Sequence, residues 1–183
     1  MPYIKKTIMS RKTAIIGSGN PLFKDEGIGL FLAKHIKDNY TFSEALEFVD
    51  GSTLGLNLQS YIQEYDHLII INTHSDKSLK AGTITIRTAD DFLQEQQTKQ
   101  TANEVVIAEM LQVCMLAGDI ADITFISITP EDLISVEVGL SESLVLVWDD
   151  LVGVVLDEIE GLGIEVSQSA YGLVGDVFDF SLS

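Results

Sequence analysis

Residues 13–29 of this chain read TAIIGSGNPLFKDEGIG, and they decide its fold. The first four residues are apolar and β-prone, and Gly17 ends them, so they predict a buried strand that enters a tight loop. Beyond the loop, apolar residues recur at helical spacing from about residue 26 to residue 37. A buried strand, a glycine-containing loop and a helix in direct succession are typical of an α/β protein.

The rest of the chain continues this alternation of strands and helices. Strands are expected at residues 46–49, 67–71, 81–87 and 123–128, and helices at residues 54–63, 103–117 and 141–160 with Thr53 and Ser141 as N-caps. The nearly continuous apolar run 67–71 predicts a central strand that is covered on both faces. Residues 81–87 alternate apolar and polar side chains, which predicts a half-exposed edge strand. Residues 88–101 predict a mobile loop with a helical turn, and the tail from residue 161 gives no firm pattern.

This element order predicts a three-layer α/β fold, a mostly parallel, twisted five-stranded sheet with helices on both faces. No internal repeat or linker marks a boundary, so residues 1–183 are expected to form a single domain. Functional sites of such sheets gather where the parallel strands end. The expected strand-end loops are residues 17–26, 50–53 and 72–76.

Charge and cysteine content exclude several classes of protein. The net charge is −17, and all 11 Lys and Arg lie in the first 100 residues, so the second part of the chain is uniformly acidic. Such a surface repels phosphate groups, which argues against nucleic-acid binding and against anionic membranes. No stretch has the roughly 20 apolar residues that span a bilayer. The single cysteine, Cys114, excludes an internal disulfide and favours a reducing, cytoplasmic location.

Common catalytic motifs are absent from the sequence. The Gly17-Ser18-Gly19 stretch does not complete a dinucleotide fingerprint, because Leu22 stands where the third glycine should be. There is no P-loop, no G-x-S-x-G elbow and no H-E-x-x-H helix. We therefore expect no nucleotide cofactor, and no nucleophile can be named.

The loop itself carries a more specific pattern. Two acids, Asp25 and Glu26, precede an apolar helix, and the helix dipole accounts for one of them as a cap. The whole loop closely resembles the N-terminal signature of the hydrogenase maturation endopeptidases, G-x-G-N-x-L-x-x-D-[ED]-G-x-G. Four later stretches resemble that family at the expected spacing, residues 50–55, 66–71, 81–84 and 128–141. The resemblance covers about residues 13–160.

The resemblance implies a function, a partner and a metal. The family removes a C-terminal extension from the large-subunit precursor of nickel-iron hydrogenases after nickel has been inserted. Under this reading the partner is that precursor, and the nickel that it presents takes the place of a resident cofactor. The resemblance further implies that the precursor contacts the loops at the sheet edge through Gly19, Asn20, Asp25, Gly51 and Thr53.

The family holds the nickel with three residues, and this chain keeps one of them. Glu26 matches the acid of the first loop. The Asp at the end of the central strand is replaced by Asn72, and the His at the start of the later helix is replaced by Asn103. Amide oxygens are weak donors for nickel, so either the site has been rebuilt or the classical chemistry has been lost. In a rebuilt site, His74 and Asp76 of the same strand-end loop would replace the lost donors, and Glu104 lies beside Asn103. The alternative for His74 is an exposed loop histidine without a ligand role.

Two functions therefore remain open at this point. The first is an endopeptidase that acts on the nickel-loaded precursor, with Glu26 as its best-supported contact and Asn72, His74 and Asn103 nearby. The second is a non-catalytic relative that binds the precursor as a chaperone or assembly factor. A hydrolase for a different substrate on the same scaffold ranks below both, because a fold alone never determines the reaction.

Overall fold

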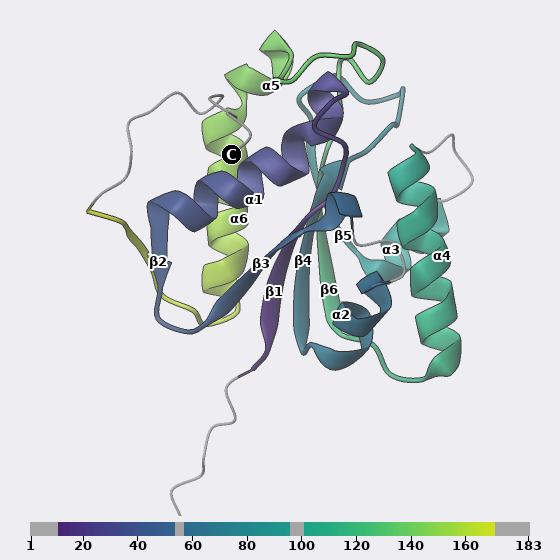
Figure 1. Ribbon diagram of the computed structural model, residues 1–183, viewed down its shortest axis with the longest axis vertical. Helices are drawn as coiled ribbons and strands as arrows, with labels where there is room; N and C mark the ends of the chain where they lie inside the picture. Colours follow the sequence, from purple (N-terminus) through teal and green to yellow (C-terminus); the bar gives the residue numbers. More distant parts are fainter. Residues whose placement is uncertain (1–10, 54–56, 96–100, 171–183) are drawn as a thin grey trace, which may run out of the picture.

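A twisted sheet lies at the centre of the molecule, and helices cover both of its faces (Figure 1). The computed structural model describes residues 11–53, 57–95 and 101–170. Its elements in chain order are β1 (Thr13–Gly17), η1 (Lys24–Gly27), α1 (Ile28–Asn39), β2 (Tyr40–Phe42), β3 (Leu46–Asp50), η2 (Gly51–Thr53), α2 (Leu58–Glu64), β4 (His67–Thr73), β5 (Ile84–Thr88), α3 (Ala89–Gln94), α4 (Ala102–Ala117), β6 (Asp122–Ile128), α5 (Glu142–Leu146), α6 (Trp148–Gly161) and β7 (Val166–Gln168).

The main sheet has five strands in the order β3-β1-β4-β6-β5. All neighbouring pairs are parallel except β5 and β6, which are antiparallel. The predicted fold class is therefore confirmed, as are β4 as a central strand and β5 as an edge strand. Strands β2 and β7 form a separate antiparallel pair that the sequence analysis did not predict.

The sheet separates two apolar cores. Side chains from one face of β1, β4 and β6 pack with α1 and α6 around residues such as Phe31, Leu151 and Val155. Side chains from the other face pack with α2, α3 and α4 around Phe92, Leu111 and Cys114. Alternate residues of each central strand thus enter opposite cores, and this explains why β1 and β4 are apolar almost throughout.

Three local predictions need correction. Helix α2 begins at Leu58 after Asn57, whereas Thr53 lies in η2, so Thr53 is not its N-cap; residues 54–56 lie outside the described residues. The stretch expected to be a mobile loop with a helical turn contains the six-residue helix α3 directly after β5, and this helix begins with a capping box between Thr88 and Asp91. The helix expected at residues 141–160 is divided at Val147 into α5 and α6.

Ser141, the residue before α5, binds the first loop rather than capping its own helix. Ser141 precedes α5 as predicted, but its side chain makes no capping bond to the helix. Its hydroxyl and its main-chain N–H both donate to Asp25 instead. The start of α5 is thereby tied to the first loop, while α6 packs against α1 in the core.

Candidate functional site

The site lies at the edge of the sheet where β1, β3 and β4 end. These strands are parallel and in register, with Gly17 opposite both Asp50 and Ile71, so the three loops that follow them emerge on the same side. The first loop is also bonded directly to β4, because the Ser18 N–H donates to the Ile71 carbonyl at 2.9 Å. The predicted meeting of the three strand-end loops is confirmed.

Glycines allow the first loop to fold back tightly on itself. Gly19 has a φ of 136°, and a Cβ atom at this position would lie 1.8 Å from the carbonyl oxygen of Glu26. A Cβ atom on Gly29 would lie 2.2 Å from the carbonyl oxygen of Ile71. Neither position tolerates a side chain, so the G-x-G pattern at the loop and the glycine at position 29 are required for backbone packing. This close packing holds Glu26 at the end of β4.

The Asp25 carboxylate is an internal anchor. It is completely buried and accepts four hydrogen bonds, from the N–H groups of Glu131, Asp132 and Ser141 at 2.8, 2.9 and 2.6 Å and from the Ser141 hydroxyl at 2.8 Å. Charge-assisted bonds of this kind stabilise a buried carboxylate. Asp25 was expected to contact the substrate, but this geometry gives it a structural role, because its acceptor capacity is used within the chain.

Glu26 has the opposite environment. Its side chain is half-buried, and within residues 11–53, 57–95 and 101–170 no hydrogen bond or ion pair to its carboxylate is found. Partial burial raises the pKa of this carboxyl group above its ordinary value. An accessible carboxylate without an internal partner is suited to bind a cation that arrives from outside.

Asn72 lies at the end of β4, and its amide is already bonded to the protein. The Ser127 hydroxyl donates to Oδ1 of Asn72 at 2.6 Å, and Nδ2 of Asn72 donates to the Thr73 carbonyl at 3.0 Å. Ser127 in turn accepts a hydrogen bond of 2.7 Å from Nη2 of the buried Arg87. The amide oxygen therefore faces Ser127 and has the Arg87 guanidinium behind it, an arrangement that is unfavourable for a metal ligand.

His74 follows β4 and is also held by internal partners. Its Nδ1 lies 3.0 Å from Oε1 of the buried Glu104, and its Nε2 lies 3.8 Å from Oε2 of Glu95. Glu104 also accepts hydrogen bonds from the Ser75 hydroxyl and from the Thr101 N–H, and this second bond belongs to the capping box of α4. The imidazole thus ties the end of β4 to the start of α4.

Asn103 and Gly51 are brought together by the fold. Both line a cavity of about 180 Å³, together with Ser18 and Ser52. Asn20 shapes its own loop, since its Oδ1 accepts a hydrogen bond of 3.0 Å from the Leu22 N–H. The side chain of Thr53 lies outside the described residues.

In the part of the chain that the structure describes, no three His, Cys, Asp or Glu side chains form a cluster that could hold a metal ion. Of the positions expected to hold nickel, Glu26 offers a carboxylate, Asn72 and Asn103 offer amides, and His74 is hydrogen-bonded to Glu104. The described residues therefore do not form a complete metal site by themselves.

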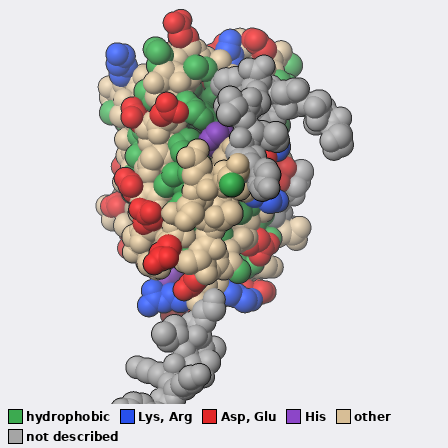
Figure 2. Space-filling view, turned by 90° about the vertical axis from the view of Figure 1, so that its left-hand side faces the viewer, with side chains coloured by type: hydrophobic (Ala, Val, Ile, Leu, Met, Phe, Trp, Pro, Cys, Tyr) green, Lys and Arg blue, Asp and Glu red, His purple; other side chains and the backbone are tan. Residues whose placement is uncertain are grey.

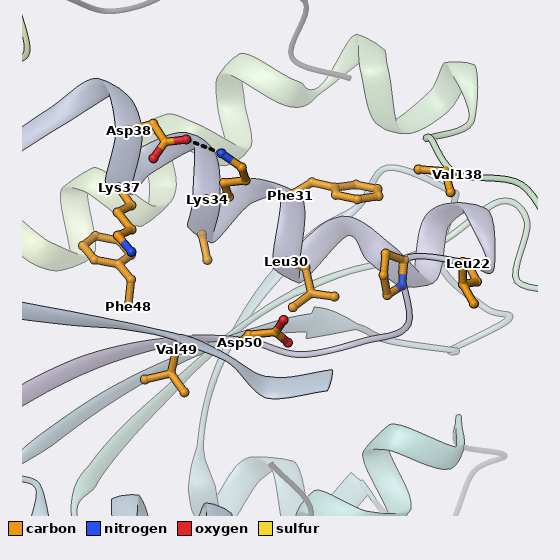
Figure 3. A pocket seen from close by; sticks show the side chains of 12 residues that line it. Leu22, Leu30, Phe31, Lys34, Lys37, Asp38, Phe48, Val49, Asp50 and Val138 are labelled. Atoms are coloured by element: carbon orange, nitrogen blue, oxygen red, sulfur yellow. Dashed lines mark hydrogen bonds and ion pairs between the residues drawn. The ribbon is translucent and has the colours of Figure 1, made fainter. Parts of the chain in front are cut away.

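A larger groove lies on the other side of the first loop. It has a volume of about 430 Å³ and runs between α1 and β3 (Figure 3). Pro21 and Leu22 line its end at the loop, and Lys37 and Phe48 line the other end. The end of β3 separates the two hollows, because Asp50 lines the groove and Gly51 lines the smaller cavity.

Three polar residues of the site were missed by the sequence analysis. Arg87, Ser127 and Glu95 connect Asn72 to His74, since Nη1 of Arg87 lies 2.6 Å from Oε2 of Glu95. Strand β5 presents Ile86 to the surface, 55% exposed, and buries Arg87. The only signal in the sequence was an arginine in an otherwise uncharged strand pattern, and such a residue is ordinarily exposed.

The family's sequence model, described as hydrogenase maturation protease (HycI), matches residues 31–158. The chain belongs to the hydrogenase maturation protease family. The match covers most of the chain and agrees with the resemblance carried by the first loop. The expected family, the expected fold and the description as a maturation protease are therefore confirmed.

Individual members of the hydrogenase maturation protease family share only about a quarter of their aligned residues with this chain. The hydrogenase 2 maturation protease of Escherichia coli K12 is 25% identical over 152 residues, which cover 82% of this chain and 92% of that protein. The hydrogenase expression/formation protein HoxM of Azotobacter vinelandii is 27% identical over 121 residues, 65% of this chain and 58% of that protein.

Solved structures agree on the fold. The hydrogenase maturating endopeptidase HybD of Escherichia coli superposes with a TM-score of 0.79 at 24% identity, over 86% of this chain and 97% of that one. The hydrogenase maturation protease HybD of Thermococcus kodakarensis gives a TM-score of 0.66 at 18% identity, over 80% and 98% of the two chains. None of the helices in the described residues is long and apolar enough to span a membrane.

Proposed function

We propose that this chain is an endopeptidase that removes a C-terminal extension from a nickel-loaded hydrogenase large-subunit precursor. The observation that carries the proposal is the Glu26 loop, because it resembles the family's signature and presents a carboxylate that no described residue binds. Membership of the family, with Escherichia coli relatives named as maturation proteases, supports the reaction class.

Nickel is part of the substrate in this proposal. The precursor brings the ion together with its own ligands, so the protease needs to supply few further donors. Glu26 supplies one anionic oxygen and lies in the loop that packs on the end of β4. A divalent ion held there would polarise the scissile carbonyl or a water molecule.

The structure supports some of the other expected precursor and nickel contacts better than others. Asn103, Gly51 and Ser18 line one cavity beside the loop and are available to a bound peptide. Gly19 and Asn20 shape the loop, whereas Asn72 and His74 are engaged in internal hydrogen bonds. We therefore propose Glu26 as the direct nickel contact and Asn103 as a precursor contact.

The charge of the chain supports a protein partner rather than a nucleic acid. With a net charge of −17, the surface opposes phosphate backbones. Figure 2 shows acidic side chains spread over the side of the molecule that carries α1 and α6. We also propose a cytoplasmic location, which agrees with the free, buried thiol of Cys114.

Cleavage of the precursor tests the proposal directly. Purified protein is incubated with the nickel-loaded precursor from the same organism, and the large subunit is followed by mass spectrometry. We expect a shortened subunit, and we expect Glu26→Gln to slow its formation by about 100-fold or more, because even outer partners of metal ligands contribute 10- to 100-fold. Glu44→Gln changes an exposed acid on a distant loop and is the matched control.

The two asparagines motivate the alternative, a relative that binds the precursor without cutting it. The internal hydrogen bonds of Asn72 are the specific observation in its favour. Binding without cleavage, under conditions in which an active family member cuts the same precursor, would establish the alternative. The double variant Asn72→Asp, Asn103→His provides a second test, because nickel affinity that appears only in this variant would show that the natural chain lacks the family's metal-dependent activity.

A further inference from the structure

The outer edge of β3 has no strand beside it in the described part of the chain. Strand β3 is the first in the order β3-β1-β4-β6-β5 and pairs only with β1. Its other side therefore presents N–H and C=O groups that an extended peptide could bind. Addition of a strand to such an edge is a common way for a protein to bind an extended segment.

The groove of about 430 Å³ lies directly beside this edge. In Figure 3 the Val49 side chain points away from the groove, although Val49 lines it, so it is the main chain of Val49 that faces the space. The opposite wall is one face of α1, with Leu30, Lys34 and Lys37 at helical spacing. A peptide paired with β3 would place alternate side chains against this wall.

The charges in the groove indicate a carboxylate on the occupant. Lys34 lies 2.5 Å from Asp38 and is neutralised by it. Asp50 is bonded to Ser52 at the other end. Lys37 forms no ion pair with any described residue, and it stands beside Phe48 at the same end as the Lys34–Asp38 pair, on a chain of net charge −17. A cation in this position is complementary to the terminal carboxylate of a peptide.

The direction of the peptide follows from the two ends of the groove. Pro21 and Leu22 belong to the loop that carries Glu26, and they line the end next to Asp50. Lys37 lies at the other end, near Phe48 (Figure 3). A chain that leaves the Glu26 loop and ends at Lys37 runs against the direction of β3. Residues 48–50 of β3 line the groove, and they offer about 10 Å of edge at roughly 3.3 Å per residue.

We propose that the precursor's C-terminal extension binds as an antiparallel strand on the free edge of β3, with its terminal carboxylate at Lys37. The inference rests on the proposed function for the identity of the occupant. The main chain of β3 supplies affinity, the α1 wall selects alternate apolar side chains, and Lys37 selects the end of the chain.

A series of N-methylated peptides tests the inference without altering the protein. The probe is a synthetic, nickel-free peptide that spans the scissile bond and the extension of the same organism's precursor, and its affinity is measured by calorimetry. A single N-methyl group is moved along the extension. Methylation should weaken binding by about tenfold or more at every second residue, where an N–H faces β3, and leave the residues between them unchanged. A flat profile, or no binding of the peptide, overturns the inference.

The charge contact is tested by a cycle of substitutions. Lys37→Glu and amidation of the peptide's C-terminus should each weaken binding by about three- to tenfold, and the two effects should not add. Lys80→Glu, an equal charge change on the loop before the opposite edge strand, is the matched control. Additive effects overturn the role of Lys37. A dimer in sedimentation that Lys37→Glu dissociates would assign the edge to a second copy instead.

Failure of the inference and failure of the proposed function are distinguishable. Glu26-dependent cleavage of the full precursor together with a flat methylation profile would leave the protease function intact and overturn the binding mode. An alternating profile without any cleavage would support the binding mode and would assign the protein to the non-catalytic alternative.

Discussion

Asp25 accepts two hydrogen bonds from Ser141, one from its main-chain N–H at 2.6 Å and one from its hydroxyl at 2.8 Å. The contact joins the first loop to the start of α5, 116 residues further along the chain. Asp25 also accepts the N–H groups of Glu131 and Asp132, so one carboxylate fixes both segments that cover the loop. The position of Glu26 therefore depends on its neighbour's internal bonds.

Replacement of Asp25 by Asn tests this dependence. The amide keeps the size of the side chain, but it removes the charge and places an NH₂ group against N–H donors, so we expect a loss of about 3 kcal/mol in the free energy of unfolding. Urea denaturation followed by circular dichroism measures it. Asp119→Asn alters an exposed acid with no described partner and should stay within about 0.5 kcal/mol of the natural protein. A similar effect of both variants would contradict the anchor role.

Part of the fold could be predicted because strands that are buried on both faces consist almost entirely of apolar residues. Strands β1 and β4 are covered on both faces, so they are apolar almost throughout and stand out from their surroundings. The short pair of β2 and β7 has no such signal, because only three residues of each strand pair and they are half-exposed or exposed. Helix α3 was expected only as a helical turn, although the Thr88–Asp91 capping box at its start is a sequence signal for a helix.

The candidate site was predictable only where it depends on the backbone. The glycines and acids of the first loop identify it, because close packing allows nothing else at Gly19 and Gly29. The buried position of Arg87 could not be predicted, since it depends on Glu95 and Ser127 from other elements. Likewise, the partner of His74 is Glu104, 30 residues away. Local periodicity contains no information about such pairs.

The pH dependence of cleavage should reflect the environment of Glu26. Burial raises the pKa of this carboxyl group, and the carboxylate form is the one that binds nickel. As the pH falls, Glu26 is therefore protonated earlier than an ordinary glutamate, and cleavage should begin to decline at a higher pH. Carboxyl-carbon NMR of the Glu26 side chain and the acidic limb of the pH–rate profile should give the same midpoint. If the acidic limb of the pH–rate profile persists in the Glu26→Gln variant, the titration of another group causes it.

The same raised pKa has a consequence for stability. A carboxyl group whose pKa is higher in the folded state binds protons more tightly there, so its favourable contribution is present at low pH and is lost as the pH rises through the folded pKa. We expect Glu26→Gln to leave stability unchanged in acid and to increase it slightly at neutral pH. Thermal denaturation of the variant at both pH values checks the sign, and a destabilised variant at neutral pH would reveal an internal partner for Glu26.

Glu104 joins the end of β4 to α4 and should contribute strongly to stability. Its buried carboxylate faces His74, Ser75 and the N–H of Thr101. Glu104→Ala removes the charge and the acceptor that these groups share, so we expect a loss of about 3 kcal/mol in the free energy of unfolding. Glu109→Ala changes an exposed glutamate of the same helix and serves as the control. Equal effects in denaturant would show that helix propensity, rather than the buried contact, is responsible.

Restoring an aspartate in place of Asn72 alone should not restore a nickel site. In the Asn72→Asp variant the new carboxylate would accept the Ser127 hydroxyl as the natural amide does, and the Arg87 guanidinium, which binds both Ser127 and Glu95, would keep it turned toward Ser127. We therefore expect Asn72→Asp to bind nickel no more tightly than the natural protein, as measured by calorimetry. Adding Arg87→Met to Asn72→Asp removes this cation at similar length, and affinity should then rise. A gain of affinity in Asn72→Asp by itself would show that the carboxylate turns away from Ser127 toward the loop of Glu26, and that Arg87 does not control the site.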